Sequence, residues 1–231
     1  MSITENLGRV TDGIAEACRR AGRNPAEITL VAVSKTVDAA RAVEAIRAGV
    51  NELGENWVQE ALPKRPAVEL LEPRRVRWHM IGHLQTNKVK KALNVFDIVQ
   101  GVDSLHLAQE LDRRAAQSDR VLPILLEVNT SGEASKFGIA PEGLPALGEA
   151  VCGLAHIRLD GLMTIGPGLS VEDPEKSRPC FQLLRDLSDR LGRELGLKLP
   201  VLSMGMSSDF AVAIAEGTTM LRIGTAIFGA R

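Results

Sequence analysis

The stretch Ile28–Lys35, which reads ITLVAVSK, is an apolar and β-branched run that ends on a lysine. Thr36-Val37-Asp38 follow, and Asp38 is well placed to N-cap a helix over Ala39–Ala48. The pattern predicts a buried strand of a parallel sheet, followed by a tight turn into a helix. Lys35 would then lie at the carboxyl end of that strand, the edge where barrel and doubly wound α/β folds carry out chemistry.

A lysine at the end of a buried strand has two interpretations. Burying an ammonium costs free energy unless the charge is paired or neutralised. Desolvation would favour the neutral amine, which makes Lys35 a candidate nucleophile. Alternatively, the side chain extends from the strand end into solvent. This stretch alone leaves both interpretations open.

The rest of the chain repeats the same alternation. An amphipathic helix with a Ser2–Glu5 capping box precedes the first strand. Seven further strands are predicted, at Glu52–Asn56, Arg77–Gly82, Asp97–Val102, Leu122–Asn129, Ile157–Ile165, Val201–Met206 and Met220–Phe228. Alternating strands and helices indicate a parallel sheet with right-handed crossovers. Eight such units in 231 residues predict an α/β protein with a single (β/α)8 TIM-type barrel, residues 1–231, and an extra N-terminal helix.

A doubly wound open sheet is the alternative fold. It should carry a Gly-rich dinucleotide fingerprint after the first strand, and VAVSKTVD does not. Between the strands we expect a helical stretch at Trp57–Leu62 that Pro63 interrupts and a helix over Leu84–Leu93. We also expect Asp209 to cap a short helix ending at Gly217.

Composition excludes several classes of protein. The net charge of −1 gives no electrostatic case for nucleic acid or an anionic membrane as the main partner. No apolar run reaches the ~18 residues of a membrane span, and the N-terminus lacks a signal-peptide pattern. Cys18, Cys152 and Cys180 are far apart and read as reduced thiols, which indicates a cytoplasmic protein without a disulfide framework or metal site.

The last two strands end in small and hydroxyl-bearing residues. Barrels often bind phosphate in the loops after these strands. The candidate N–H and O–H donors are Ser203, Ser207, Ser208, Gly224 and Thr225, although such residues are also ordinary turn formers.

Arg222 lies inside the apolar eighth strand, where a buried guanidinium needs an acceptor. It either pairs with a carboxylate on a neighbouring strand or faces a ligand. A lysine on the first strand, a phosphate cradle on the last two and an arginine between them suggest pyridoxal phosphate.

Several separated motifs carry a resemblance to a known family. They are VAVSK at 31–35, GEN at 54–56, WHMIGHLQTNK at 78–88, SMGMS at 203–207 and RIGTAIFGAR at 222–231. Together they resemble the pyridoxal-phosphate homeostasis protein family, whose members resemble the barrel domain of alanine racemase. The match runs from the first strand to the last residue.

The resemblance implies a site for pyridoxal 5'-phosphate. Lys35 would form a Schiff base with the cofactor, and Arg222 would face its pyridine nitrogen. Ser203, Gly224 and Thr225 would hold the phosphate, while Met204 and Asn56 would line the ring. The family regulates the supply of the cofactor, and hence vitamin B6 homeostasis, and has no established catalytic reaction.

The block His79–Lys88 has no clear assignment. His79 and His83 are four residues apart, but a strand-to-turn switch lies between them, so helical metal-ligand spacing does not apply. We expect His79 to form hydrogen bonds inside the core, with catalysis as the alternative. Lys136, in the loop after the fifth strand, could reach the barrel mouth.

Three functions compete: an amino-acid racemase-like enzyme, a non-enzymatic carrier, and a structural barrel without a cofactor. Two-base racemisation needs a proton donor on each face of the substrate. In alanine-racemase-like enzymes a tyrosine from a second domain serves one face, and this sequence has no tyrosine and ends with its eighth strand. We therefore expect a cofactor carrier that is a monomer or weak dimer, with recipient apo-enzymes as candidate partners.

Overall fold

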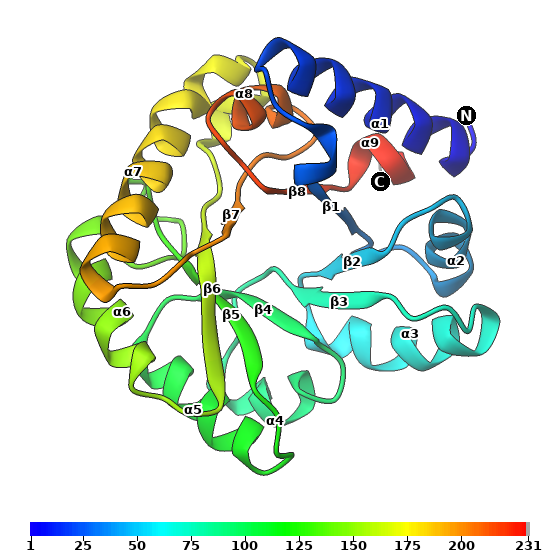
Figure 1. Ribbon diagram of the computed structural model, residues 1–231. Coiled ribbons are helices and arrows are strands. Elements are labelled where there is room, and N and C mark those ends of the chain that lie inside the picture. The colour runs from blue at the N-terminus through cyan, green and yellow to red at the C-terminus, as the bar shows by residue number, and fades with distance from the viewer. Residues whose placement is uncertain (230–231) are drawn as a thin grey trace.

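The protein is a closed barrel of eight parallel strands paired in the order in which they occur in the sequence (Figure 1). The computed structural model describes residues 1–229, apart from the side chains of residues 169 and 170. The strands are β1 (Thr29–Val33), β2 (Glu52–Glu55), β3 (Arg77–Met80), β4 (Ile98–Val102), β5 (Leu122–Glu127), β6 (Ile157–Met163), β7 (Val201–Ser203) and β8 (Met220–Ile223). The predicted TIM-type barrel is confirmed, because β1 pairs in parallel with both β2 and β8.

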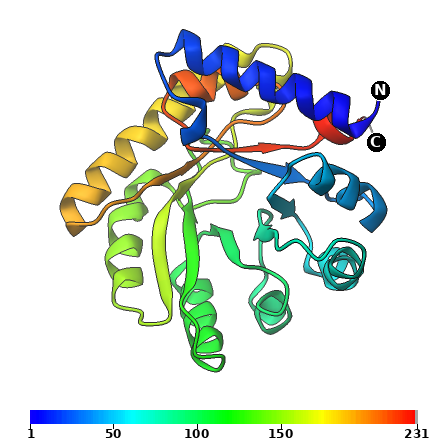
Figure 2. The ribbon, with the colours of Figure 1, turned by 45° about the vertical axis from the view of Figure 1, so that its right-hand side comes forward.

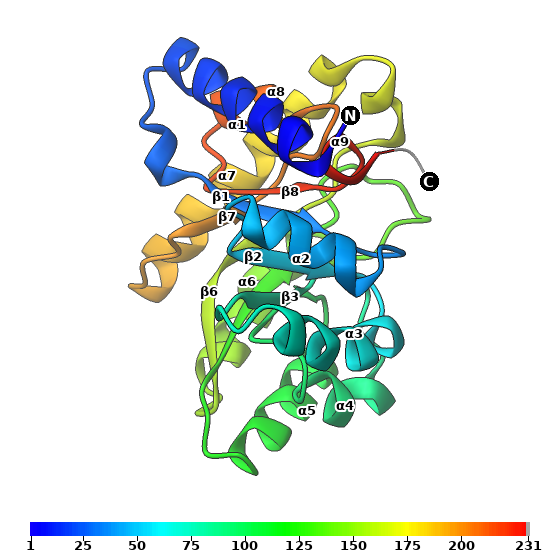
Figure 3. The ribbon, with the colours of Figure 1, turned by 90° about the vertical axis from the view of Figure 1, so that its right-hand side faces the viewer.

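Helices surround the barrel on its outside (Figures 1 and 2). They are α1 (Ile3–Arg20), α2 (Ala39–Arg47), α3 (Val58–Leu71), α4 (Val89–Ala92), α5 (Leu105–Ala116), α6 (Leu144–Cys152), α7 (Arg178–Leu195), α8 (Phe210–Ala215) and α9 (Thr225–Phe228). The extra N-terminal helix α1 starts with the predicted Ser2–Glu5 capping box and packs beside α8 and α9 (Figure 3). None of the helices within residues 1–229 is both long and apolar enough to cross a bilayer.

Two helix predictions near the third strand are wrong. The helix after β2 continues through Pro63 and Pro66 to Leu71 instead of breaking at Pro63. Its buried face, which includes Ala61, Lys64 and Val68, packs against the barrel, so tertiary packing outweighs the loss of two backbone hydrogen bonds. The helix predicted over Leu84–Leu93 is instead a 3-10 turn at Thr86–Lys88 followed by the single turn α4.

The last two strands are shorter than predicted. The eighth strand ends at Ile223, and Gly224 begins the short helix α9 within the segment expected to remain extended. The seventh strand ends at Ser203, and the chain turns through Gly205, whose φ of 94° is a conformation that favours glycine. The segments after Ser203 and after Ile223 are therefore turns at the carboxyl end of the barrel, where strands were predicted to continue.

Asp209 precedes α8 as predicted, but its carboxylate does not cap that helix. One carboxylate oxygen accepts a hydrogen bond from the backbone N–H of Met206 at 2.7 Å, and the other accepts from the hydroxyl of Ser177 at 2.7 Å. Asp209 therefore fixes the loop after β7. In contrast, Asp38 caps α2 as expected, accepting from the backbone N–H of Arg41.

Candidate functional site

A cavity of about 400 Å³ lies at the carboxyl ends of β1, β2 and β8. Five of the seven residues predicted to bind the cofactor line it, namely Lys35, Asn56, Arg222, Gly224 and Thr225, together with Ser207 and Ser208. Its volume lies within the usual range for small-molecule sites. The residues come from opposite ends of the sequence, and the closure of the barrel between β1 and β8 brings them together.

Ser203 and Met204 do not line this cavity. Both residues are fully buried, and Met204 belongs to the apolar core. The hydroxyl of Ser203 accepts a hydrogen bond from Arg222 and donates one to Gln100, both at 2.6 Å. Of the three serines that the sequence pattern offered, the loop after β7 therefore presents Ser207 and Ser208 to the cavity, whereas the family resemblance implied Ser203.

The backbone on either side of Lys35 is firmly held. Ser34, directly before it, accepts a hydrogen bond at its carbonyl oxygen from the Lys64 ammonium at 2.8 Å. Its hydroxyl donates to a carboxylate oxygen of Glu55 at 2.6 Å. Thr36, directly after it, has a φ of 63° and donates its N–H to the carboxylate of Glu60 at 3.0 Å. The position of Lys35 at the cavity edge is thus fixed through its main chain.

Lys64 and Glu55 form a buried ion pair behind this segment, with 2.7 Å between Nζ and Oε1. The second carboxylate oxygen of Glu55 is buried and accepts no hydrogen bond from any described residue. Burial raises the pKa of Glu55, against the opposing effect of hydrogen bonds from Lys64 and Ser34. This pair was not predicted from the sequence, where its one signal is a lysine on the buried face of a helix.

Arg222 is almost completely buried on β8 and also lines the cavity. Its Nη1 donates to the Ser203 hydroxyl at 2.6 Å, and its Nη2 donates to the carbonyl oxygen of Thr164 at 2.7 Å. Burial lowers its pKa to about 10, with Glu127 and Asp209 acting in the opposite direction, so the guanidinium is charged at neutral pH. Within residues 1–229 no carboxylate forms a direct ion pair with Arg222, and the acceptors of these two hydrogen bonds are neutral oxygens.

The cavity lining also contains residues with short polar side chains and a glycine. Ser207 and Ser208 come from the loop after β7, and Gly224 and Thr225 follow β8 at the start of α9. The two segments are tied together, since the backbone N–H of Ala226 donates to the Ser207 hydroxyl at 3.4 Å and that of Arg222 donates to the Gly205 carbonyl at 3.1 Å. Short polar side chains and turned backbone of this kind suit an anion.

Glu127, at the end of β5, is a buried group that the sequence analysis missed. Burial raises its pKa to about 7, Arg222 opposes that rise, and Asp103 adds to it. It lines a neighbouring cavity that shares Asn56, Ile81 and Ile165 with the first. Its signal in the sequence is a single acidic residue within the apolar run LPILLEVN.

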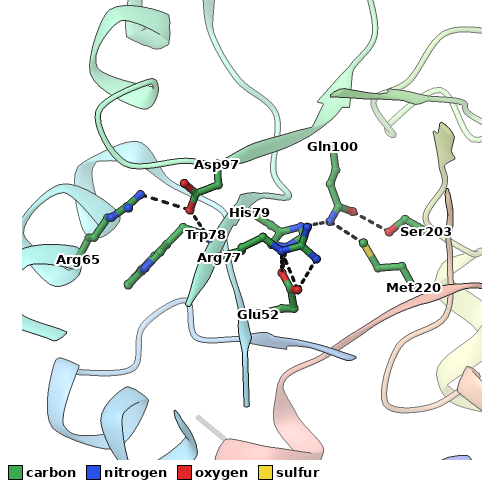
Figure 4. A network of polar contacts seen from close by, with 9 residues as sticks. All are labelled: Glu52, Arg65, Arg77, Trp78, His79, Asp97, Gln100, Ser203 and Met220. Carbon is green, nitrogen blue, oxygen red and sulfur yellow. Dashed lines mark hydrogen bonds and ion pairs between the residues drawn. The ribbon is translucent and has the colours of Figure 1, made fainter. Parts of the chain in front are cut away.

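The His79–Lys88 block is divided by the fold. His79 is fully buried and hydrogen-bonded to Glu52 and Gln100, which confirms the expected role inside the core (Figure 4). His83 lies outside the core, where its ring stacks on that of Phe137 with 4.1 Å between ring centroids. Among the described residues, no three His, Cys, Asp or Glu side chains are grouped as metal ligands. Lys136 donates to the Gly166 carbonyl at 2.5 Å.

The donor set of the first cavity fits pyridoxal phosphate. That cofactor presents an aldehyde, a ring nitrogen and a phosphate, and the cavity offers a primary amine, a donor-only guanidinium, and a group of hydroxyls with backbone N–H. The three kinds of group lie on one cavity lining.

Comparisons with known proteins give the same indication. Residues 6–231 match the family model described as alanine racemase, N-terminal domain. A pyridoxal phosphate homeostasis protein from Aquifex aeolicus is 45% identical over 231 residues, covering 100% of this chain and 99% of the relative. The structure of PipY from Synechococcus elongatus PCC7942 with PLP bound has a TM-score of 0.84 and 36% identity, covering 99% of this chain and 100% of that one.

A more distant solved structure shares the fold only. Alanine racemase from Clostridium difficile 630 has a TM-score of 0.77 at 18% identity, and the match covers 100% of this chain but 57% of the racemase. The full-length match to the homeostasis proteins is both closer and more complete. The chain therefore belongs to the pyridoxal phosphate homeostasis protein family, among the proteins that share the alanine racemase N-terminal domain.

Proposed function

We propose that this protein binds pyridoxal 5'-phosphate in the cavity at the carboxyl ends of β1, β2 and β8 and acts as a carrier and buffer of the cofactor. The observation that carries the proposal is the presence of Lys35, Arg222 and the hydroxyls of Ser207 and Ser208 on one cavity lining. The names of the full-length relatives and the PLP-bound structure of PipY support the choice of ligand.

Each group of the cavity has a proposed task. When bound, pyridoxal phosphate supplies an aldehyde that reacts reversibly with primary amines, and the Lys35 amine would provide the covalent link. Arg222 would donate a hydrogen bond to the ring nitrogen and keep it unprotonated, because a guanidinium is only a donor. Ser207, Ser208 and Thr225 would hold the phosphate. Asn56 would line the ring.

We propose a carrier rather than an amino-acid enzyme for two chemical reasons. A racemase needs a second proton donor opposite the lysine, and the sequence contains no tyrosine to act as one. A ring nitrogen kept unprotonated by Arg222 withdraws electrons less effectively than a pyridinium paired with a carboxylate, which weakens carbanion chemistry without abolishing it. A reversible covalent link also suits a carrier, since it shields a reactive aldehyde and still releases it. Recipient apo-enzymes in the cytoplasm are the proposed destination.

Absorbance titration with pyridoxal phosphate tests the proposal. We expect the absorbance band of lysine-bound cofactor to appear in the wild-type protein and to reach its maximum at one pyridoxal phosphate per protein chain. Lys35→Ala should lose that band while equilibrium dialysis still detects weak binding through the phosphate contacts. The loaded wild-type protein is then incubated with amino acids and assayed by chiral chromatography. Sustained turnover would contradict the carrier assignment and favour a racemase-like enzyme.

A further inference from the structure

A line of five buried side chains crosses the interior of the barrel and ends at the proposed cofactor cavity. We call it the Arg222 chain, and it consists of Arg222 on β8, Ser203 on β7, Gln100 on β4, His79 on β3 and Glu52 on β2. Figure 4 shows the part from Ser203 to Glu52. Successive contacts are 2.6 Å from Arg222 Nη1 to Ser203 Oγ, 2.6 Å from Ser203 Oγ to Gln100 Oε1, 2.8 Å from Gln100 Nε2 to His79 Nδ1, and 2.6 Å from His79 Nε2 to Glu52 Oε2.

The hydrogen bonds from Arg222 to His79 all run in one direction, with each residue donating to the next. A guanidinium only donates, so the Ser203 hydroxyl accepts from Arg222 and gives its single hydrogen to the Gln100 carbonyl oxygen. The orientation of the Gln100 amide is then fixed, and its Nε2 donates to His79. The second hydrogen of that Nε2 points to the sulfur of Met220 at 3.2 Å, so both are used.

The opposite end of the Arg222 chain determines the state of the other nitrogen of the His79 ring. Glu52 accepts from His79 and from the half-exposed Arg77, whose Nε lies 2.8 Å from Oε1. Burial raises the pKa of Glu52, but the hydrogen bonds from His79 and Arg77 outweigh it and hold the pKa below its ordinary value. An ionised carboxylate only accepts, so Nε2 of His79 carries the proton. The Gln100 contact requires a bare Nδ1 and the Glu52 contact requires a protonated Nε2, so the two contacts together describe a neutral His79 with its proton on Nε2.

We propose that Ser203, Gln100 and His79 are positioning residues for Arg222, held in one hydrogen-bond direction between the guanidinium and the Glu52 carboxylate. This inference deepens the proposed function, on which its link to the cofactor rests. Since Arg222 forms no ion pair within residues 1–229, the hydroxyl of Ser203 and the carbonyl of Thr164 are what aim its head group. Reversing the Gln100 amide would present an oxygen to His79 and require an imidazolium there.

The first test uses the protein without cofactor. Nitrogen-15 NMR of the imidazole should show that His79 has a protonated Nε2 and a bare Nδ1 in the wild-type protein. The isosteric variant Gln100→Glu places a second carboxylate against Nδ1 and should convert His79 to the doubly protonated ring. Protonation of Nδ1 in the wild-type protein would overturn the proposal. The proposal would also be overturned if the protonation of the His79 ring were the same in Gln100→Glu as in the wild type.

The second test measures the dissociation constant of pyridoxal phosphate. Gln100→Met removes the acceptor that orients Ser203, and we expect binding to weaken about tenfold. The control is Asp97→Asn. Asp97 accepts a hydrogen bond at 2.9 Å from the backbone N–H of Trp78, which lies on β3 beside His79, but it makes no contact with the Arg222 chain (Figure 4). The Asp97→Asn protein should bind pyridoxal phosphate with the affinity of the wild type. Wild-type affinity in a folded Gln100→Met protein would overturn the positioning role.

These two readouts separate the inference from the proposed function. If the wild-type protein does not bind pyridoxal phosphate, the proposed function fails. The tautomer of His79 then still tests the hydrogen-bond directions described for the Arg222 chain. If the wild-type protein binds and His79 has the opposite tautomer, only the further inference fails.

Discussion

The backbone around Lys35 and the head group of Arg222 are held by different kinds of contact. Lys35 is fixed through its main-chain neighbours, since Ser34 is bonded at its carbonyl and hydroxyl and Thr36 at its N–H. Arg222 is fixed by its head group, through hydrogen bonds to the Ser203 hydroxyl and the Thr164 carbonyl. The support behind Lys35 contains a buried ion pair, whereas the support behind Arg222 begins with neutral acceptors.

The difference matches what each residue is proposed to do. An amine that forms and breaks a covalent link needs a side chain that can move while its Cα stays in place. The hydrogen bonds of the neighbouring backbone hold that Cα. A guanidinium that faces a ring nitrogen needs a fixed orientation, because a hydrogen bond weakens steeply as its angle departs from linear. Neutral acceptors also leave the positive charge of Arg222 without a direct carboxylate contact among residues 1–229, which suits its proposed role towards a ligand.

The largest predicted effect comes from breaking the ion pair behind Lys35. Lys64→Met removes the ammonium that binds both Glu55 and the Ser34 carbonyl and leaves a buried carboxylate without its partner. We expect a loss of about 3–5 kcal/mol in the free energy of unfolding, measured by urea denaturation. The double variant Lys64→Met/Glu55→Leu should recover part of it. A loss below about 1 kcal/mol in the single variant would show that the pair does not anchor this segment.

A smaller, pH-dependent effect is predicted at Glu127, the buried carboxylate near Arg222. Its pKa in the folded protein is about 7, against an ordinary value of 4.5. The folded state therefore binds this proton more tightly, and the associated stability is complete below pH 4.5 and lost as the pH rises through 7.

Glu127→Gln should accordingly gain stability relative to wild type as the pH rises from 5 to 8, by about 2–3 kcal/mol. Parallel urea denaturation of both proteins at the two pH values measures the change. A stability difference that does not depend on pH would mean that Glu127 titrates at its ordinary value.

Removing the head-group contacts at Arg222 should affect binding more than folding. Arg222→Ala deletes a charged donor that lies near the ring nitrogen in the proposed complex, so we expect affinity for pyridoxal phosphate to fall by about 1.5–3 kcal/mol. The absorbance of the bound cofactor should also shift. Circular dichroism serves as the control. An unfolded variant would instead assign Arg222 a structural role.

The smallest effect is expected among the hydroxyls. Ser208→Ala removes one neutral donor from the proposed phosphate side of the cavity and should weaken binding by about 1 kcal/mol. Competition by inorganic phosphate should weaken in parallel, because the same contact is lost. If competition by phosphate is unchanged in Ser208→Ala, this loop does not hold the phosphate.

The sequence predicted the elements that have strong local signals. The β-branched run ending at Lys35, the capped helices and the alternation of eight strands led directly to the barrel, and an arginine inside an apolar strand identified Arg222 as a candidate. These features depend on residues close together in the sequence. The closure of β8 against β1 then placed Lys35 and Arg222 on the same cavity.

Features that depend on distant partners could not be predicted in this way. The pairing of Lys64 with Glu55 requires knowing that α3 continues through two prolines. The burial of Ser203 follows from where β7 ends, and its hydroxyl is occupied by partners on β4 and β8. Similarly, the apolar segment after Ile223 favoured a longer strand, while the structure turns at Gly224 into α9.

Borohydride reduction followed by peptide mapping tests the central claim most directly. The protein is loaded with pyridoxal phosphate, reduced, digested, and analysed by mass spectrometry. We predict one reduced cofactor per chain, attached to Lys35. A reduced cofactor on another lysine, such as Lys64 or Lys136, or no attached cofactor after saturation, would contradict the assignment of Lys35 as the covalent anchor.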